Sequence, residues 1–539
     1  MKKIITSLIL IGALAISSCK SLEVTPPNSI YDSQISELIA TGDEETVSKV
    51  LTAIGANLPA YFNYYSSSYT GYSAVALNSQ YDQEFIRSML GNDALIGTTA
   101  TATTSGHYVY YQLESKNWRD GTTNQNSAYW NMPADFITAA NKVMKYVNED
   151  VIAKNPAVAG TLAEALVVRA WGYLLLAERY APAYSLNPGA RGVPIYTEYR
   201  VNPVVAPSSL AEVYNKVISW LNRAIELFDA INTGYTAELG DIDKGVAQYL
   251  LMRAALEFGD YATVISAGED IVAAYPTLIP VEKYGAKNAD IDAYAAKTKE
   301  LYAKDNAFTS ADANPEAILA FKKGALYNRA DAYSYCNAFA ASVGRDFPRI
   351  DNRLYEMIAP NDVRKNIFTD HAIDYTFVTN VDENITNTIT IPPYTTLKWG
   401  ATICLDETER TQRTYSDDII IRASEVYLML AEAYAQSNRG TDAENTLNKI
   451  LAARSTSGTL TCSNYPSMSG MSALEKVKLQ TRIEMWLEKG LEFNNNKRWG
   501  IAVDRTGSAN HFSAVKTLSL DEMNIEIPVD ELYTNPNWK

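Results

Sequence analysis

Apolar residues recur at helical spacing along most of this chain. The clearest stripe predicts a helix over residues 208 to 229, where Ser209 and Glu212 have the spacing of a capping box. Its apolar positions repeat every three or four residues, and they are Leu210, Val213, Tyr214, Val217, Leu221, Ala224, Ile225 and Phe228. This period is typical of a helix with one buried face. A similar pattern predicts a helix over residues 161 to 180.

Other helical stretches come in pairs joined by short links. Only Gly259-Asp260 separates the apolar period of residues 244 to 258 from that of residues 261 to 274. So short a link forces two helices to run antiparallel, as an αα-hairpin.

The helical pattern returns late in the chain. It predicts one helix from Ile420 to Gln436 and a second that follows Gly440 and ends near Arg454, with Thr441 and Glu444 as its cap. Ser472 and Glu475 predict a third start, for a helix ending near Gly490.

Helix pairs at a period of about 34 residues, with small residues such as Ala431 and Ala433 packed against large ones, are typical of a tetratricopeptide array. We therefore expect a mainly helical, all-α fold with a scaffold of tetratricopeptide-like pairs within residues 31–60, 131–275 and 416–490. An irregular helical protein without repeats is the alternative.

Two long stretches lack a helical period. Residues 61–130 are rich in Tyr, Ser, Thr and Gly, and residues 276–415 mix short helical pieces with strands such as Thr388 to Ile391. Long irregular segments inside a compact protein often carry function. We expect the ligand site in these two regions.

The first residues have the pattern of an export signal. Met1-Lys2-Lys3 is positively charged, residues 4 to 16 are almost wholly apolar, and Ser17-Ser18-Cys19 follows. This order is typical of a bacterial lipoprotein signal, and the apolar run is shorter than the roughly 20 residues that cross a membrane. We predict a signal peptide over 1–18, lipidation of Cys19, an extended tether over 19–30 and a single body over 31–539. A secreted protein with an incidental cysteine is the alternative.

Composition narrows the function classes. The net charge of −15 repels phosphate backbones, so nucleic-acid binding is not expected. Cys336, Cys404 and Cys462 stand far apart with no C-x-x-C spacing, so we expect free thiols, although one disulfide pair stays possible. The chain has 36 Tyr and 8 Trp, whose flat faces and polar rims suit surfaces that meet polar ligands.

Six motifs spread over nearly the whole chain carry a family resemblance. They are Cys19 with Leu22-Glu23-Val24-Thr25-Pro26-Pro27; Tyr129-Trp130 to Ala139-Ala140-Asn141; Ala163-Glu164-Ala165 to Arg169-Ala170 with Tyr173 and Gly192-Val193-Pro194-Ile195-Tyr196; Ile421 to Leu428 with Ala431-Glu432-Ala433; Arg482-Ile483-Glu484 with Trp486, Glu488, Gly490 and Lys497-Arg498-Trp499-Gly500; and Ile527-Pro528 to Asn535-Pro536-Asn537-Trp538. In this order they resemble the SusD/RagB family of outer-membrane nutrient-binding lipoproteins of Bacteroidetes. Asn494-Asn495-Asn496 departs from the aromatic or Asp-Leu run usual there, and Lys20 replaces the acidic residues that often follow the lipid cysteine.

The resemblance implies a function as well as a fold. Such proteins have four tetratricopeptide-like pairs and an irregular second half, and they cover a SusC-like TonB-dependent transporter in the outer membrane. They capture an oligosaccharide, or in some members a peptide, and perform no catalysis. The resemblance therefore implies a glycan-binding lipoprotein that faces the cell exterior, without a cofactor. A peptide-capturing RagB-like member, a periplasm-facing helical scaffold and a lipid-anchored glycosidase are the alternatives.

Aromatic and polar residues in the irregular regions are the candidate ligand contacts, because sugar rings stack on aromatic faces while hydroxyls need polar partners. We expect Trp118 as the platform, with Arg119, Asp82 and Asn78 as hydrogen-bond partners. The further candidates are Tyr81, Tyr108, Tyr327 and Tyr333. Each could instead fasten its loop to the body.

The remaining polar and aromatic motifs carry weaker expectations. Asp290-Ile291-Asp292 and Asp382-Glu383-Asn384 could hold a loop calcium ion, although neither matches an EF-hand loop. Neighbouring acids such as Asp417-Asp418, or Glu407 with Glu409, do not by themselves supply the carboxyl spacing of a glycosidase, so an enzyme is not expected. We expect packing roles for Trp171, Trp220, Trp486 and Trp499, and polar pairs between helices for Arg169, Glu425 and Arg482.

Overall fold

The computed structural model describes residues 32–63, 80–96, 118–199, 205–236, 238–296, 303–322, 348–380, 385–399, 417–511 and 515–539. Its contacts divide the chain into two compact units, Met1–Ala53 and Ile54–Lys539. Several predicted features lie outside the described residues: the signal peptide, Cys19 and the tether, Asn78, Tyr108, Tyr327, Tyr333, Cys336, Cys404, Glu407, Glu409 and Asp382-Glu383-Asn384.

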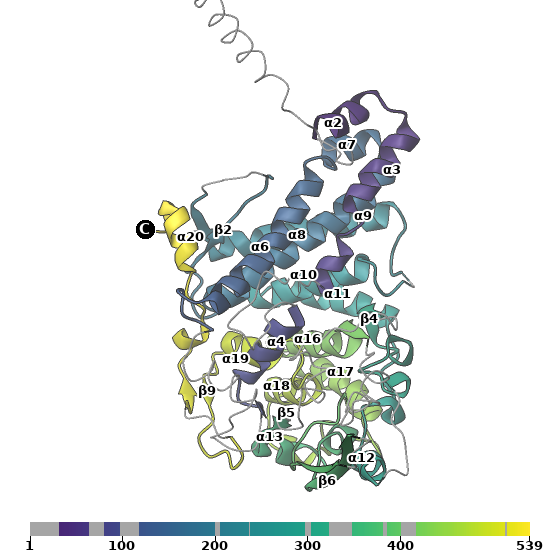
Figure 1. Cartoon of the computed structure of the whole chain (residues 1–539), viewed down its shortest axis with the longest axis vertical. Helices are drawn as coiled ribbons and strands as arrows, with labels where there is room; N and C mark the ends of the chain where they lie inside the picture. Colours follow the sequence, from purple (N-terminus) through teal and green to yellow (C-terminus); the bar gives the residue numbers. More distant parts are fainter. Residues whose placement is uncertain are drawn as a thin grey trace, which may run out of the picture. The chain divides into compact units, whose positions relative to one another are not determined.

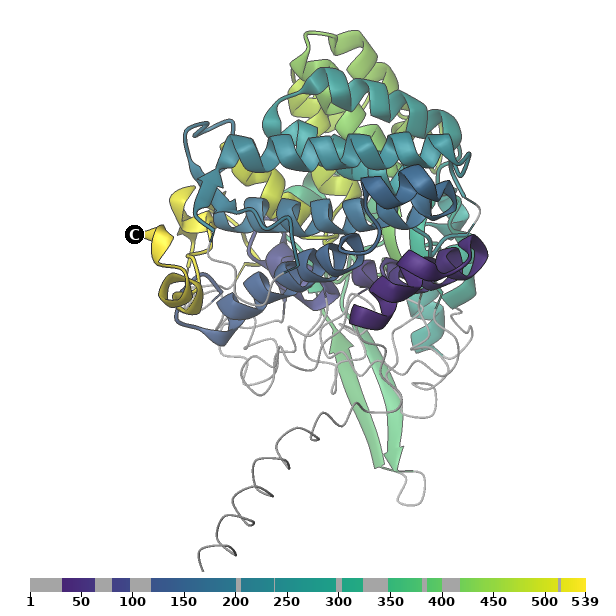
Figure 2. The same cartoon turned by 90° about the horizontal axis from the view of Figure 1, so that it is seen from above.

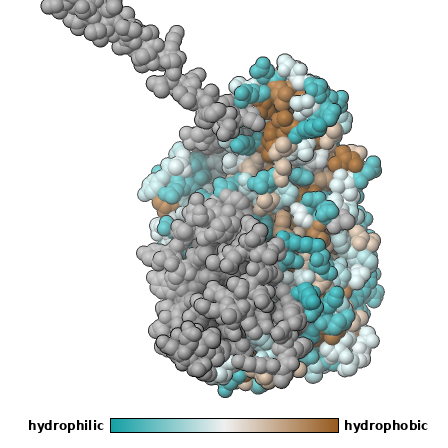
Figure 3. Space-filling model, turned by 45° about the vertical axis from the view of Figure 1, so that its right-hand side comes forward, coloured by the Kyte–Doolittle hydropathy of each residue, from teal (hydrophilic) through white to brown (hydrophobic). Residues whose placement is uncertain are grey.

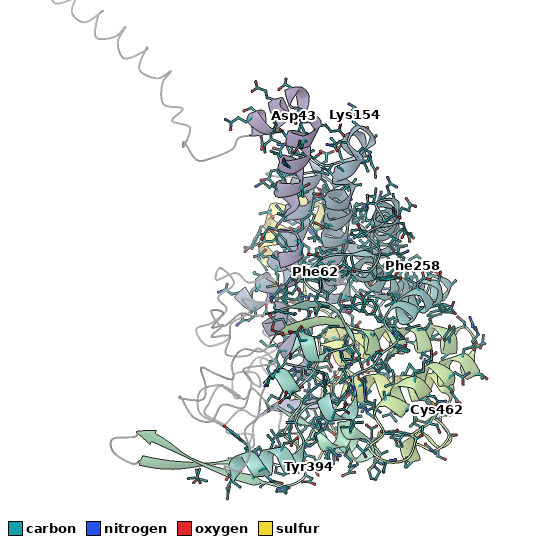
Figure 4. All side chains as sticks on the ribbon, turned by 90° about the vertical axis from the view of Figure 1, so that its right-hand side faces the viewer. Asp43, Phe62, Lys154, Phe258, Tyr394 and Cys462 are labelled. Atoms are coloured by element: carbon teal, nitrogen blue, oxygen red, sulfur yellow. The ribbon has the colours of Figure 1, made fainter. Side chains whose placement is uncertain are left out.

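The described part of the smaller unit is helical. It contains α2 (Asp32–Thr41) and most of α3 (Glu44–Gly55). Asp43, labelled in Figure 4, caps α3, because its carboxylate accepts hydrogen bonds from the Thr46 backbone N–H at 2.9 Å and from the Thr46 hydroxyl at 2.8 Å.

The larger unit is also mainly helical, which confirms the predicted fold class (Figure 1). Its α-helices are α4 (Gln80–Met89), α6 (Asn124–Met144), α7 (Glu149–Lys154), α8 (Ala159–Tyr180), α9 (Leu210–Ala230), α10 (Lys244–Phe258), α11 (Tyr261–Ala274), α12 (Asn288–Ala295), α13 (Asn352–Met357), α14 (Val363–Asn366), α16 (Ala423–Gln436), α17 (Gly440–Ala453), α18 (Ala473–Glu484), α19 (Leu491–Arg498) and α20 (Val529–Thr534). Short 3₁₀ turns are η2 (Pro59–Asn63), η3 (Pro156–Val158), η4 (Val281–Lys283), η5 (Ala303–Asp305), η6 (Ala311–Ala313), η8 (Pro466–Met468), η9 (Asp521–Met523) and η10 (Pro536–Trp538).

Strands of the larger unit form small antiparallel pairs. These are β1 (Ala94–Ile96) with β5 (Pro348–Ile350), β2 (Arg191–Pro194) with β3 (Pro207–Ser209), β4 (Ala317–Phe321) with β8 (Asp418–Arg422), β6 (Ile373–Asn380) with β7 (Ile385–Ile391), and β9 (Val503–Asp504) with β10 (Thr517–Leu518). The predicted strand over residues 388 to 391 is confirmed as part of β7. Figures 2 and 4 show the β6–β7 hairpin projecting from the larger unit.

Consecutive long helices pack against one another in layers (Figures 1 and 2). α8 contacts α6 and α9, α10 contacts α9 and α11, and α16 contacts α11 and α17. The predicted hairpin of α10 and α11 is confirmed to the residue. Gly259 ends α10 with φ of +84°, a conformation that favours glycine, and Asp260 caps α11 by accepting a hydrogen bond from the Thr263 N–H.

Two predicted capping boxes are confirmed, at Ser209 with Glu212 and at Ser472 with Glu475. The ends of two late helices are corrected. α18 ends at Glu484 and not near Gly490, and the backbone turns away within three residues, because φ is positive at Leu487 (61°) and again at Lys489 (54°) and Gly490 (64°) before α19 begins. Likewise Thr441 is not a cap, because α17 already begins at Gly440.

The helix predicted from Ile420 begins later. Residues 418–422 form β8 and pair with β4, and α16 starts at Ala423. Consecutive β-branched isoleucines at 419 to 421 favour a strand where a partner strand is present. That partner lies about a hundred residues earlier, so the local pattern could not show it.

α8 lies at the centre of the core. Residues Pro156–Tyr180 have the length and apolar composition of a membrane-crossing helix, but 89% of their most apolar window is buried inside the protein. α8 is therefore a core helix of the larger unit. Trp171, Trp220 and Trp486 are buried, as predicted. The coloured part of the face in Figure 3 is mainly teal and white with smaller brown areas.

Eight charged residues, all buried except the partly buried Glu488, meet where α14, α16, α17 and α18 approach β4 and β8. Glu484 is at the centre of this buried charge cluster, and its carboxylate lies 2.8 Å from Arg422 Nη1, 2.8 Å from Arg454 Nη2 and 3.2 Å from Arg364 Nη1. The other members, Glu316, Asp362, Lys398 and Glu488, pair with these arginines or with one another. The cluster joins the helical scaffold to the region predicted as irregular.

The end of the chain returns to its early part. Arg482 binds Asp93 through its Nε at 2.8 Å, and the Trp486 indole donates to the Asp93 carbonyl at 2.8 Å. Arg505 donates to the carbonyl oxygens of Leu90 and Gly91. The polar pairs predicted for Arg482, Glu425 and Arg169 are thus present, and the structure identifies their partners as Asp93, Lys489 and Asn141.

Candidate ligand pocket

A pocket in the larger unit opens where η2, α4 and β8 approach the turn after α18. The part of it that admits a water-sized sphere is about 30 Å³, room for roughly two water molecules, and the pocket is partly open to solvent. Its lining residues are Phe62, Gln80, Glu84, Phe308, Trp399, Asp417, Ile419, Ile420, Glu488 and Lys489. They come from separate stretches of the sequence.

Aromatic and aliphatic side chains form the apolar part of the wall. The rings of Phe308 and Trp399 meet at 66° with their centroids 6.3 Å apart. Phe62, labelled in Figure 4, stacks parallel to Trp171 with centroids 5.9 Å apart, which fixes it against α8. Lys398 places its Nζ 4.8 Å from the Phe308 centroid and 5.3 Å from that of Trp399, so these rings already contact a cation.

Two charged residues of the lining are neutralised by their neighbours. Glu488 accepts from Arg422 Nε at 2.9 Å and from Lys398. Burial alone would raise the pKa of Glu488, but the combined fields of Arg422 and Lys398 outweigh it and lower the pKa to about 2. Lys489 binds Glu425 and the Tyr249 hydroxyl.

Glu84 differs from those residues. It lies on α4 with 8% of its surface exposed, and its carboxylate accepts a hydrogen bond from the Gln80 amide nitrogen at 2.8 Å. Within the described ranges, no Lys, Arg or His forms an ion pair with it. Burial is the largest influence on Glu84 and raises the pKa of its carboxyl, while the Gln80 hydrogen bond and the charges of Lys489, Arg253 and Arg179 act in the opposite direction.

Gln80 adds a second acceptor one helical turn away. Its amide nitrogen is used by Glu84, while its buried Oε1 accepts no hydrogen bond in the described part of the chain. Since a buried acceptor without a donor costs free energy, the pocket is suited to a ligand that brings hydrogen-bond donors. Aromatic walls beside such acceptors match the requirements of a sugar ring.

The predicted site residues that are described do not line this pocket. Trp118 is 1% exposed and packs edge-on to Phe493 with ring centroids 5.9 Å apart, and its Nε1 is buried without an acceptor among the described residues. Arg119 lies 3.7 Å from Glu526. Tyr81 and Asp82 lie on α4 between Gln80 and Glu84, but their side chains are outside the described part. Ligand contacts for all of these residues stay a prediction.

The sequence placed two candidates beside the pocket but did not predict the helix that carries them, because residues 61–130 were expected to be irregular whereas residues 80–89 form α4. Tyr81 and Asp82 are close in sequence to Gln80 and Glu84, yet nothing local distinguishes Glu84 as a buried carboxyl. Trp399 lies in the irregular region 276–415, where the ligand site was expected, and Lys398 before it gave no signal.

The first predicted calcium segment has other contacts. Asp290 caps α12 by accepting from the Lys287 N–H at 3.1 Å, and Asp292 lies 3.1 Å from His371 Nε2. Over the described residues, no three or more His, Cys, Asp or Glu side chains gather as metal ligands. Cys462 is a buried free thiol.

Comparisons with known proteins point to one family. A family model described as "Starch-binding associating with outer membrane" matches residues 61–235, and one described as "SusD family" matches residues 287–538. No curated protein matches the chain in sequence.

Several solved structures share the fold. A SusD-like carbohydrate binding protein from Bacteroides vulgatus is 19% identical with a TM-score of 0.65, covering 91% of this chain and 97% of its own. A SusD superfamily protein from Bacteroides thetaiotaomicron is also 19% identical, with a TM-score of 0.63 and coverages of 90% and 98%. Surface glycan-binding protein A from Bacteroides thetaiotaomicron, solved with laminarihexaose, is 13% identical with a TM-score of 0.58 and coverages of 90% and 97%.

Proposed function

Because the chain belongs to the SusD/RagB family, whose models match residues 61–235 and 287–538, we propose that it is a non-catalytic lipoprotein that binds an oligosaccharide at the cell surface. The protein acts by binding alone. Aromatic contact and hydrogen bonds hold the ligand, and no covalent bond is made or broken.

The two family models carry this proposal, and the pocket is the first place in the described residues to test it. This pocket combines the rings of Phe62, Phe308 and Trp399 with the acceptors of Gln80 and Glu84. Sugar-binding sites use such rings for the apolar C–H face of a sugar and such acceptors for its hydroxyls. The solved relative that holds laminarihexaose adds support at the level of the fold.

We further propose that Cys19 anchors the protein by lipid to the outer membrane, with the body facing the exterior. The bound oligosaccharide then passes to a SusC-like TonB-dependent transporter. One family model, described as associating with the outer membrane, supports the location. Protease treatment of intact cells tests the orientation, since a surface protein is cut whereas a periplasm-facing scaffold survives.

A binding screen tests the function directly. Full-length protein in detergent is titrated with a panel of polysaccharide fragments and peptides, and reducing-end release is followed in the same samples. We expect binding to at least one glycan class without hydrolysis. Binding to peptides alone would favour the peptide-capturing alternative, and release of reducing ends would identify a glycosidase.

A pair of tryptophan variants locates the binding. Trp399→Leu should lower the affinity for the glycan about tenfold, since an aromatic contact is worth ~1.5 kcal/mol. Trp538→Leu is the control, because Trp538 is half-buried against Trp130 and does not line the pocket. Equal affinities of the two variants would place the glycan elsewhere.

A further inference from the structure

We propose that an oligosaccharide of neutral sugars contacts a second, open surface of the larger unit, at the base of the β6–β7 hairpin. This hairpin-base surface consists of Asp292, Tyr355, Asp370, His371 and Tyr394, and it shares no residue with the lining of the pocket. The proposal rests on the glycan-binding function proposed above and adds a contact site to it.

Tyr394 has a backbone conformation that a tyrosine rarely adopts. Its φ is +69°, and a positive φ in so bulky a residue is an outlier. Two hydrogen bonds hold it there, since the Tyr394 N–H donates to the Thr369 carbonyl at 2.6 Å and the Tyr394 carbonyl accepts from the Ile350 N–H at 3.0 Å. Figure 4 labels Tyr394 where the hairpin leaves the body of the larger unit. Residues held in such strained conformations gather at ligand sites.

Tyr355 supports the ring of Tyr394. The two rings meet edge to face, with centroids 5.1 Å apart and planes at 80°. Tyr355 is itself fixed by Phe368, at a centroid distance of 6.3 Å, and by the Lys365 ammonium, 4.4 Å from the Tyr355 centroid. Both tyrosines are half-buried, and neither hydroxyl forms a hydrogen bond within the described ranges. The pair therefore offers an apolar ring and a polar rim to a ligand on the surface.

Two exposed carboxylates lie next to this aromatic pair. His371 lies between them, with its Nδ1 2.6 Å from Asp370 Oδ1 and its Nε2 3.1 Å from Asp292 Oδ1 on α12. The exposed fractions of these side chains are 58% for Asp370, 51% for His371 and 47% for Asp292. Burial, followed by the charge of Asp370, raises the pKa of Tyr355, so this carboxylate is close enough to act on the aromatic pair.

The class of sugar follows from these groups. An ionised carboxylate only accepts hydrogen bonds, and each of the two keeps lone pairs beyond the one that faces His371. Sugar hydroxyls donate to such oxygens while the C–H face of a sugar contacts an aromatic ring. Two carboxylates outnumber the single imidazole and disfavour acidic sugars. Because the polar side chains are open to solvent, a sugar chain can lie across the surface without an enclosed cavity.

Calorimetric titration of the full-length protein in detergent tests the surface. The neutral probes are laminarihexaose, maltohexaose, cellohexaose and xylohexaose, and the acidic probe is hexagalacturonate. We expect at least one neutral hexasaccharide to bind, and hexagalacturonate to bind at least about tenfold more weakly. Hexagalacturonate that binds as tightly as the neutral probes would overturn the proposal.

Tyr394→Asn separates ligand contact from packing. Asparagine tolerates a positive φ, so the melting midpoint should stay within about 2 °C, while loss of the ring should lower the affinity for the bound hexasaccharide about tenfold. Tyr533→Asn is the matched control, because it removes an 81% exposed tyrosine on α20 and should leave both quantities unchanged. An affinity of Tyr394→Asn within about twofold of the unaltered protein would overturn the proposal.

Asp370→Asn covers the case in which Tyr394→Asn lowers the melting midpoint further. It changes an exposed side chain and keeps its shape, so the midpoint should not move. A neutral acceptor forms weaker hydrogen bonds than a carboxylate, and the affinity should fall about threefold or more. Unchanged affinity of Asp370→Asn would overturn the proposal.

The outcomes also distinguish this surface from the proposed function. Weaker binding in Trp399→Leu, with unchanged binding in Tyr394→Asn and Asp370→Asn, leaves the proposed function standing and overturns the hairpin-base surface. Binding of hexagalacturonate alone has the same meaning. Binding of peptides with no oligosaccharide bound overturns both.

Discussion

Glu484 is the residue whose removal should destabilise the protein most. Its carboxylate, fully buried, contacts Arg364, Arg422 and Arg454 at 2.8 to 3.2 Å. Glu484→Gln keeps the shape and one carbonyl oxygen but leaves three buried guanidinium groups short of an anion. Removing one partner of a buried ion pair typically costs about 3–5 kcal/mol.

That cost can be expressed as a melting temperature. Unfolding entropy near 2.1 cal/mol/K per residue gives about 1 kcal/mol/K over the length of the unit Ile54–Lys539. We therefore expect the melting midpoint of Glu484→Gln to fall by about 3–5 °C in differential scanning calorimetry.

A surface pair provides the control. Glu226 pairs with Arg223 at 2.8 Å on α9, where its side chain is 64% exposed. Exposed pairs contribute roughly 0–1 kcal/mol, so Glu226→Gln should move the midpoint by about 1 °C or less. A shift of Glu484→Gln no larger than that of Glu226→Gln would refute the view that the buried charge cluster holds the unit together.

Three further predictions concern acid stability, helix contact and helix capping. The pKa of Glu488 is about 2 in the folded protein against 4.5 for an ordinary glutamate. The stabilisation that the Glu488 carboxylate provides is therefore complete above pH 4.5 and is lost as the pH falls toward 2. Melting midpoints measured from neutral pH to about pH 3 should decline accordingly, and the decline should be less steep in Glu488→Gln. Gly172→Ala would place a Cβ 2.8 Å from the Pro133 carbonyl oxygen and from Ile137, and this contact should lower the free energy of unfolding by about 1–3 kcal/mol in calorimetry. Gly440→Ala is the control, because its Cβ would meet nothing closer than 3.4 Å and should leave the free energy of unfolding unchanged. Ser472→Ala removes the hydroxyl that accepts from the Glu475 N–H and should cost about 1 kcal/mol in the same measurement.

Local signals in the sequence predict the helices well. The capping box at Ser209 and the two-residue link at Gly259 each act within a few residues, so both starts and ends follow from the chain itself. Ile420 shows where local signals fail. Three consecutive isoleucines are compatible with a helix or a strand, and pairing with the distant strand β4 makes them a strand. The domain boundaries stay a prediction.

The pocket could not be predicted in the same way. Phe62, Gln80, Phe308, Trp399 and Glu488 are scattered along the chain, and only the fold brings them together. Trp118 illustrates the converse, since an aromatic residue in a predicted loop packs against Phe493, nearly four hundred residues later. Whether an aromatic side chain is a ligand-stacking platform or a core residue depends on such partners, which lie far away in the sequence.

The return of the late chain to β1 sets an order for folding. Asp93 is bound by Arg482, 389 residues further on, and by the Trp486 indole. At synthesis rates of about 5–20 residues per second, Asp93 leaves the ribosome about 20–80 s before Arg482. During that time α4 and β1 lack the partners that bury them, so the nascent chain must be kept from aggregating until its last segments arrive.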